Sequence, residues 1–138
     1  MKELIELFET HQQGVGEPAI RQAEQNLNAR FPQQYVELFQ LANGPQIGEW
    51  QLFPVKDPDN EKKTWDDVVR QNSEAAELPE ELLIIGHDGT GDYVCFTVED
   101  GQAQGAVFLW DHETRQVEKL APSLKQFILY TTEEEDEE

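Results

Sequence analysis

Residues 23–44, AEQNLNARFPQQYVELFQLANG, constrain the fold of this chain more than any other stretch. They combine two amphipathic helical patterns with a proline break at Phe31-Pro32 and a stop signal at Asn43-Gly44. The residue before a proline is pushed out of the α region, whereas the proline suits the first turn of the next helix. Asn and Gly tolerate the left-handed conformation beyond a helix end, so the stretch predicts an αα-hairpin. The apolar faces would contain Ile20, Ala23 and Leu27 in the first helix and Tyr35, Leu38, Phe39 and Ala42 in the second.

The rest of the N-terminal half predicts two more helices and one strand. Residues 2–12 have the apolar spacing of a short helix, which glycines then interrupt. Residues 49–53 have a strand-like composition, and the polar segment 54–63 predicts a mobile surface loop. A further helix is expected over about residues 64–76, with a capping arrangement Thr-x-x-Asp at its start. The buried stripe of this helix would contain Trp65, Val68 and Val69.

Short β-rich runs separated by turns dominate the second half, at 82–85, 93–98, 106–110 and 117–120. The glycine-containing turns between them are typical of an antiparallel meander. Neither face of the run 93–98 is plainly polar, which predicts a central strand. Ser123 and Gln126 have the capping-box spacing at the start of a last amphipathic helix. The expected fold is α+β: a mostly antiparallel central sheet packed with helices, with an N-terminal αα-hairpin and a C-terminal helix.

The chain of 138 residues carries a formal charge of −19, from 10 basic and 29 acidic residues. Its length predicts a single domain, 1–132, and the acidic run 133–138 is expected to be a disordered tail. Without the six acids of that run, the charge is still 10 − 23 = −13. This excess argues against binding nucleic acid through phosphates, which needs a basic footprint, and it favours a basic protein partner.

The same composition also limits the cellular compartment and the cofactors that are expected for this protein. No stretch is apolar enough for a signal sequence or a membrane span, which predicts a cytoplasmic protein with no membrane contact. The single cysteine, Cys95, excludes an internal disulfide framework and leaves no cysteine cluster for a structural zinc. No cofactor is expected.

The run 86–92, GHDGTGD, gathers groups that suggest a metal site or a phosphate loop. A calcium loop needs a distant bidentate Glu, however, and a P-loop needs Gly-Lys-Ser/Thr after its glycines, and neither is present. The run is therefore interpreted as a tight connection in which glycines supply positive φ and aspartates bond to the turn backbone. A surface recognition loop is the alternative.

Asp111 and His112 form an Asp-His pair at a predicted strand end, where a general base and its orienting carboxylate can sit. Adjacent residues on an extended chain point to opposite faces, and a nucleophile is also missing. Ser73, Ser123 and Cys95 each have a simpler role, as helix surface, cap and core thiol. No catalytic residue, no enzyme activity and no metal site are predicted.

An ordered set of motifs runs through most of the chain. It consists of an Ala-Glu-x-x-Leu helix, Phe31-Pro32-x-x-Tyr35, Phe39, Asn43-Gly44, Gly89-x-Gly91-Asp92-Tyr93-x-Cys95, Val107-x-x-Trp110-Asp111-His112 and a C-terminal Ser-Leu-x-x-Phe helix. In this order the motifs resemble the SUKH superfamily over residues 20–129. That superfamily is named partly for a fungal cell-wall-synthesis regulator. In bacteria it is dominated by immunity proteins that bind and neutralise secreted polymorphic toxins, often nucleases, and its members are not known to be enzymes.

The resemblance implies mainly structural roles for the family's recurrent positions, which are Glu24, Pro32, Tyr35, Asn43, Gly44, Gly91, Asp92 and Trp110. It also implies a non-catalytic immunity protein that binds a cognate toxin domain, and the charge of −13 predicts that this domain is basic. The alternative is an intracellular regulatory or scaffold protein of the cell-wall-regulator type. A third hypothesis, metal-dependent hydrolysis around His87, Asp88 and His112, would require stoichiometric bound metal.

Partner contacts are expected on the acidic surface and the loops, because relatives must recognise different partners. An exposed indole would serve as an interface anchor. The candidate contact residues are Trp50, Asp66, Asp67, Asp88, Asp92, Trp110, Asp111 and Glu113.

Overall fold

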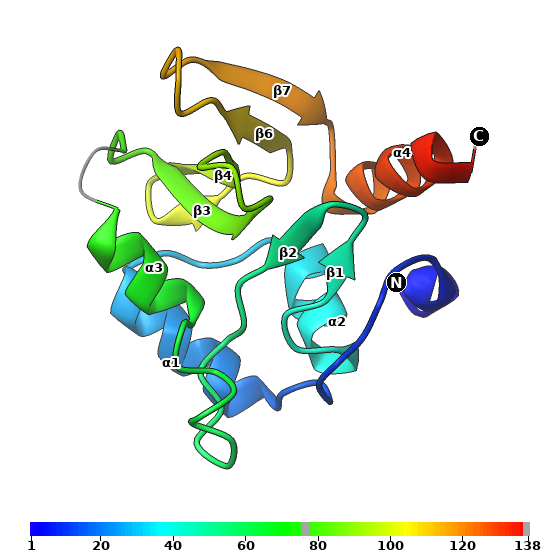
Figure 1. The fold of residues 1–138 in the computed structure, drawn as a ribbon. Coiled ribbons are helices and arrows are strands. Elements are labelled where there is room, and N and C mark those ends of the chain that lie inside the picture. The colour runs from blue at the N-terminus through cyan, green and yellow to red at the C-terminus, as the bar shows by residue number, and fades with distance from the viewer. Residues whose placement is uncertain (76–77, 137–138) are drawn as a thin grey trace.

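The computed structural model describes residues 1–75 and 78–136 (Figure 1). The elements in chain order are the 3-10 helix η1 (Lys2–Leu7), α1 (Glu17–Leu27), α2 (Gln33–Leu41), β1 (Gln46–Ile47), β2 (Trp50–Leu52), α3 (Val68–Glu74), β3 (Leu82–His87), β4 (Tyr93–Glu99), β5 (Gln102–Ala103), β6 (Val107–Trp110), β7 (Val117–Ala121) and α4 (Leu124–Asp136). Helices pack against one curled antiparallel sheet, which confirms the predicted α+β class with its N-terminal helices and C-terminal helix.

The sheet has the strand order β1-β2-β3-β4-β6-β7, with β5 paired to the far end of β4. All of its strand pairs are antiparallel. β4 lies between β3 and β6, so the prediction of a central strand at 93–98 is confirmed. Val94, Cys95 and Phe96 on this strand are fully buried, which explains why neither of its faces reads as polar.

The helices divide between two sides of the structure. α1 packs against α3, whereas α2 packs against η1 and α4, and α4 also contacts β7 and β1 (Figure 1). α1 ends at Leu27 because Asn28 takes the left-handed conformation, with φ 59° and ψ 35°. The helix therefore ends before Phe31-Pro32, where the sequence predicted its end. Pro32 is the N-cap of α2.

One hydrophobic core joins the helices to the sheet. Tyr35 lies at its centre, stacked between Phe31 and Phe39 with ring centroids 4.0 and 4.1 Å away, and it meets the edge of Phe96. The buried Glu24 carboxylate accepts a 2.8 Å hydrogen bond from the backbone N–H of Phe31, which ties α1 to the start of this stack.

Two asparagine side chains hold the backbone of distant segments. Asn43 donates to the carbonyl of Val55 (2.9 Å) and accepts from its N–H (2.8 Å). Asn72 on α3 does the same for Ile84 on β3, with N···O distances of 2.9 and 3.0 Å. The sequence predicts that Asn43 ends a helix. In the structure its side-chain amide bonds the backbone N–H and carbonyl of a buried segment, as a neighbouring strand would.

The segment that leads into α3 differs from its prediction. The helix begins at Val68, and its N-cap is Asp67, whose Oδ1 accepts from the N–H groups of Val69 and Arg70. Thr64 is not the cap: its buried hydroxyl bonds to the Asn60 carbonyl within the preceding loop. Trp65 precedes the helix and is 63 % exposed, so the prediction that it belongs to the buried stripe is wrong.

Both ends of the chain also differ from expectation. The predicted helix 2–12 is a 3-10 helix that ends at Leu7. α4 begins after Ser123, whose hydroxyl accepts from the N–H of Gln126 as the capping box predicted. The backbone of α4 stays helical to Asp136, inside the run assigned to a tail, and 137–138 lie outside the described residues. The division into domain and tail stays a prediction.

Candidate functional site

The turn between β3 and β4 is built by glycines and one aspartate. Gly89 and Gly91 have φ values of 88° and 111°, which only glycine adopts readily. Asp88 Oδ1 accepts from the N–H and the hydroxyl of Thr90, which closes the turn. These contacts confirm the interpretation of 86–92 as a tight connection. Gly86 is different, because it lies within β3 and a Cβ there would come 2.8 Å from the Gln51 carbonyl oxygen.

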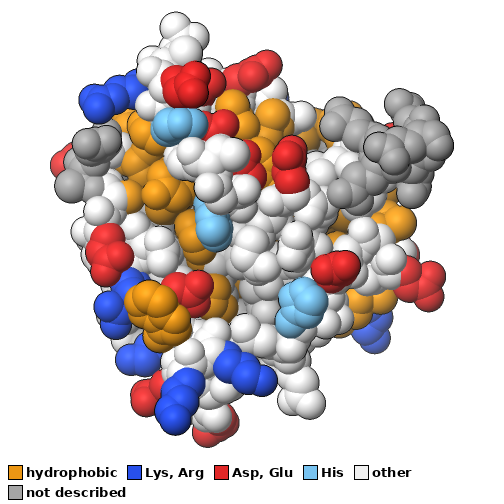
Figure 2. All heavy atoms as spheres, viewed as in Figure 1, with side chains coloured by type: hydrophobic (Ala, Val, Ile, Leu, Met, Phe, Trp, Pro, Cys, Tyr) orange, Lys and Arg blue, Asp and Glu red, His pale blue; other side chains and the backbone are white. Residues whose placement is uncertain are grey.

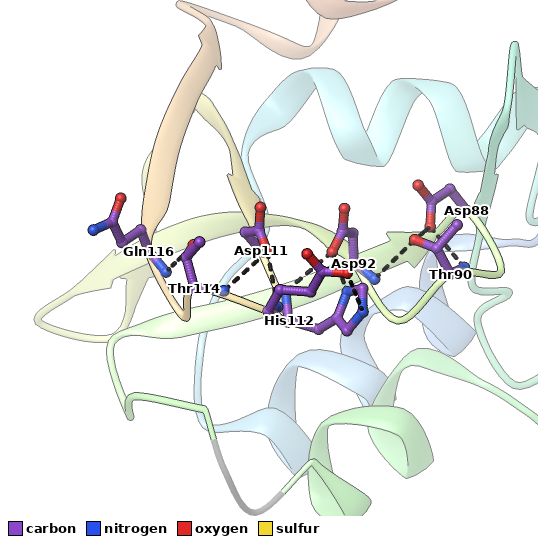
Figure 3. A network of polar contacts seen from close by, with 8 residues as sticks. Asp88, Thr90, Asp92, Asp111, His112, Thr114 and Gln116 are labelled. Carbon is purple, nitrogen blue, oxygen red and sulfur yellow. Dashed lines mark hydrogen bonds and ion pairs between the residues drawn. The ribbon is translucent and has the colours of Figure 1, made fainter.

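The neighbouring turn between β6 and β7 is also closed by an aspartate. Asp111 Oδ1 accepts from the N–H groups of Glu113 and Thr114, and the Asp111 N–H donates to the Gln116 carbonyl. Tyr93 pairs with Trp110 across the two strands, so Asp92 and Asp111 are the next residues beyond that pair. Figure 3 shows the aspartates of both turns in one line along this end of the sheet.

His112 joins the two turns through Asp92 rather than through its neighbour Asp111. Asp92 Oδ1 accepts from the His112 backbone N–H at 3.0 Å and lies 2.6 Å from Nδ1 of the ring (Figure 3). The backbone bond and then the ring bond hold the pKa of Asp92 below its ordinary value. The same ring bond to Asp92 raises the pKa of His112 above 6.5. Gly91 packs on this ring, because a Cβ there would lie 3.0 Å from Cγ.

Aromatic side chains form a row across the sheet next to the Asp92–His112 pair. His87, Tyr93 and Trp110 are cross-strand partners on β3, β4 and β6, so their side chains share one face. The Tyr93 and Trp110 ring centroids are 5.9 Å apart, with the ring planes 36° apart. Phe53 extends the row, stacked on His87 at 5.3 Å.

A pocket of about 540 Å³ opens beside this row, between the sheet and the end of α3. We call it the α3–β4 pocket; its walls are Glu74, Ala75, Leu78, Gly91, Tyr93, Trp110 and His112. Two aromatic rings line one part, and Glu74 and His112 also line the pocket, with the His112 ring paired to Asp92. Figure 2 shows hydrophobic and histidine side chains together with acidic ones on this upper-left part of the molecule. The arrangement suits a ligand with a cationic head and an apolar stem.

The opposite end of the same face carries a group of basic side chains. Lys56, Lys62, Lys63 and Arg70 belong to the loop before α3 and its first turn, and they supply four of the ten basic residues. Figure 2 shows Lys and Arg side chains gathered at this lower end. The exposed Trp65 indole lies among them, 5.7 Å below the Arg70 guanidinium carbon. The same segment, residues 54–70, also contains five acids, so its formal charge is 4 − 5 = −1 and its basic groups are interspersed with acidic ones.

The structure separates the predicted contact residues into three groups. Trp50 and Trp110 are each 5 % exposed, so neither provides the exposed indole that was expected as an interface anchor. Asp67 is buried as the cap of α3, and the half-buried Asp66 precedes it at the lysine-rich end. The remaining residues, Asp88, Asp92, Asp111 and Glu113, lie together on the two turns beside the α3–β4 pocket.

The hypothesis of a metal site at His87, Asp88 and His112 does not match the geometry, because the group of ligating atoms found among the described residues includes neither His87 nor Asp88. Among the described residues, Asp92, Asp111 and His112 place one ligating atom each within 4.8 Å of one another. Oδ1 of each aspartate already accepts two hydrogen bonds, which gives both carboxylates a structural role in the turns.

Several residues of the site had no local sequence signal. Tyr93 was assigned only to a strand, while Glu74 and Leu78 come from a helix end and the segment after it. The Asp92–His112 pair joins residues 20 apart in the chain. The strand register alone would have revealed it, because pairing Tyr93 with Trp110 brings Asp92 next to the residues that follow Trp110.

The fold and this surface define a small α+β binding domain, with its polar groups used in turns and its pocket lined by aromatic rings. The family model SUKH_5, described as SMI1-KNR4 cell-wall, matches residues 1–133, and the chain belongs to this SUKH family. The membership supports a binding module of the broad immunity and regulatory type. A search of curated proteins finds no match. No described helix combines the length and the apolar character that crossing a membrane requires.

Proposed function

We propose that the protein is a cytoplasmic, non-catalytic immunity protein that binds a cognate, basic toxin domain and blocks its working surface. The observation that carries this proposal is family membership combined with the charge, which is −13 even without the last six residues. A basic toxin, such as a nuclease with a phosphate-binding surface, is the natural complement of such a protein.

The acidic turns beside the α3–β4 pocket are the surface that best suits this partner. Asp88, Asp92, Asp111 and Glu113 lie on two turns at one end of the sheet, whereas acids and lysines are mixed in the loop before α3. Long-range attraction raises encounter rates roughly 10- to 1000-fold at low salt. The association rate constant with the toxin should therefore fall steeply as ionic strength rises. A rate constant that does not change with salt concentration would contradict the electrostatic part of the proposal.

The direct test is co-expression with a toxin domain encoded beside the gene for this chain. Rescue of growth together with co-purification of a 1:1 complex is expected. Rescue without a complex would contradict occlusion, and a complex without rescue would contradict neutralisation.

A second candidate is a regulatory or scaffold protein with an endogenous partner, which the cell-wall wording of the family description favours. Gene neighbourhood separates the two. An adjacent gene for a large secreted protein with a variable C-terminal domain favours immunity, and a chain from a genome without such a gene favours the regulator.

A further inference from the structure

We propose that the α3–β4 pocket receives an arginine side chain of the basic partner. The inference rests on the proposed function and adds the chemistry of one contact to it. Arginine combines an apolar stem with a planar cation, and the pocket offers partners for both parts.

The aromatic part of the pocket is suited to a planar cation. Tyr93 is half-buried, and Trp110 beside it on the neighbouring strand is almost covered, so their orientation is set by packing before a ligand arrives. A guanidinium group is weakly hydrated and stacks on aromatic faces, whereas an ammonium group is strongly hydrated. Rings already held in place lose little side-chain entropy on binding.

The charged part of the pocket offers one carboxylate, that of Glu74. Glu74 lines it from α3, with its side chain 62 % exposed, and its ion pair with Arg70 is long at 3.8 Å. Such exposed pairs contribute little, so an incoming guanidinium can replace Arg70 as the partner of Glu74. His112 lines the pocket as well, and the Asp92 carboxylate, which pairs with this ring, balances its charge when it is protonated.

Size and position agree with this occupant. Pockets of roughly 300–1,000 Å³ hold small ligands, and this one has about 540 Å³, more than one side chain needs. A larger groove of about 750 Å³ lies between α1 and α3, but no aromatic side chain lines it, and its acidic residues Glu61, Asp67 and Glu74 are accompanied by Lys56 and Arg70. The α3–β4 pocket is therefore the better receptor for a cation.

The first test uses the whole ¹⁵N-labelled chain with N-acetyl-arginine amide as the probe, followed by NMR. We expect saturable shifts of the Trp110 indole N–H and of the amides of Tyr93 and His112. N-acetyl-lysine amide should bind at least about threefold more weakly, and the norleucine analogue should not saturate. Equal binding of norleucine, tighter binding of lysine, or shifts confined to other regions would overturn the inference.

The variants separate the ring from the charge. Tyr93→Leu should abolish saturable arginine binding, while Tyr93→Phe, which keeps the aromatic face, should preserve it and guards against a mere loss of folding. Glu74→Gln should weaken binding severalfold. Asp59→Asn, the same charge change in the lysine-rich loop, should leave it unchanged. Arginine binding that survives Tyr93→Leu contradicts the inference.

The toxin assay distinguishes a failure of this inference from a failure of the proposed function. If Tyr93→Leu neutralises the toxin as well as the parent chain does, the pocket is not the contact, although immunity stands. If the parent chain does not protect but Tyr93-dependent arginine binding persists, the pocket stands and the partner is not that toxin.

Discussion

Replacing Asn43 with alanine removes two hydrogen bonds that no other described side chain provides to Val55. The residue is 1 % exposed and Val55 is fully buried, so the N–H and the carbonyl of Val55 would both lose their partner away from water. An unsatisfied buried polar group costs about 1–3 kcal/mol. The expected loss for Asn43→Ala is therefore about 2–6 kcal/mol, a large part of the roughly 5–15 kcal/mol that stabilises a typical domain.

This loss can be measured by thermal and urea unfolding. A chain of 138 residues has an unfolding entropy of about 290 cal/mol/K, so each kcal/mol lowers Tm by about 3.5 °C. Asn43→Ala should thus melt roughly 7–20 °C lower. The control is Asn26→Ala on the exposed surface of α1, where the change should be under about 0.7 kcal/mol and stabilising, because alanine is the better helix former.

The isosteric change Asn43→Asp refines the test. A carboxylate can still accept from the Val55 N–H, but it cannot donate to the Val55 carbonyl and it buries a charge. Its deficit should shrink at acid pH, where a protonated carboxyl regains a donor. If Asn43→Ala lowers the free energy of unfolding by less than about 1 kcal/mol, the role assigned to this amide is contradicted. A loss of stability in Asn43→Asp that is the same at acid and neutral pH would contradict it as well.

Three further predictions concern single side chains. The His112 ring should titrate above 6.5 by NMR and return toward that value in Asp92→Asn, and an unchanged titration would contradict the pair. Because the pKa of His112 is raised and that of Asp92 lowered, the pair stabilises fully between about pH 3.8 and 6.5, and this contribution fades on either side. Tyr35→Phe should not destabilise, and should gain up to about 1 kcal/mol in urea unfolding, since the hydroxyl has no partner among the described residues; a loss above that size would reveal one. Burial raises the pKa of the Cys95 thiol to about 12, so iodoacetamide at pH 8 should label it only as fast as the protein unfolds. Equal labelling rates in buffer and in urea would show that this thiol is accessible.

Much of the architecture could be predicted from local pattern. The runs at 82–85 and 93–98 are short, largely apolar and separated by turn glycines, and they form β3 and β4 within two residues of the expected ends. Ser123 caps the last helix as its spacing predicted. These features are short-range, because hydrophobic period and cap chemistry act within a few residues.

The candidate site could be predicted only in part. Asp88, Asp92, Asp111 and Glu113 were chosen for charge and loop position, and they do lie at one end of the sheet. Their neighbours in the pocket come from α3 and from the strand register, which the residue pattern does not state. The prediction that Trp65 is buried rested on its hydrophobicity and was wrong. Hydrophobicity shows that burying an indole is favourable, but not whether other segments pack over that position.

The amino-acid sequence by itself determined the secondary-structure types, the order of the motifs and the acidic balance of this protein. Only the tertiary structure decided that Asn43 holds Val55, that Asp92 holds His112, and that Tyr93 and Glu74 share one pocket. The physical reason is distance along the chain. Propensity and charge belong to each residue and its near neighbours, whereas burial, pairing and a shared cavity exist only once segments far apart in sequence have packed together.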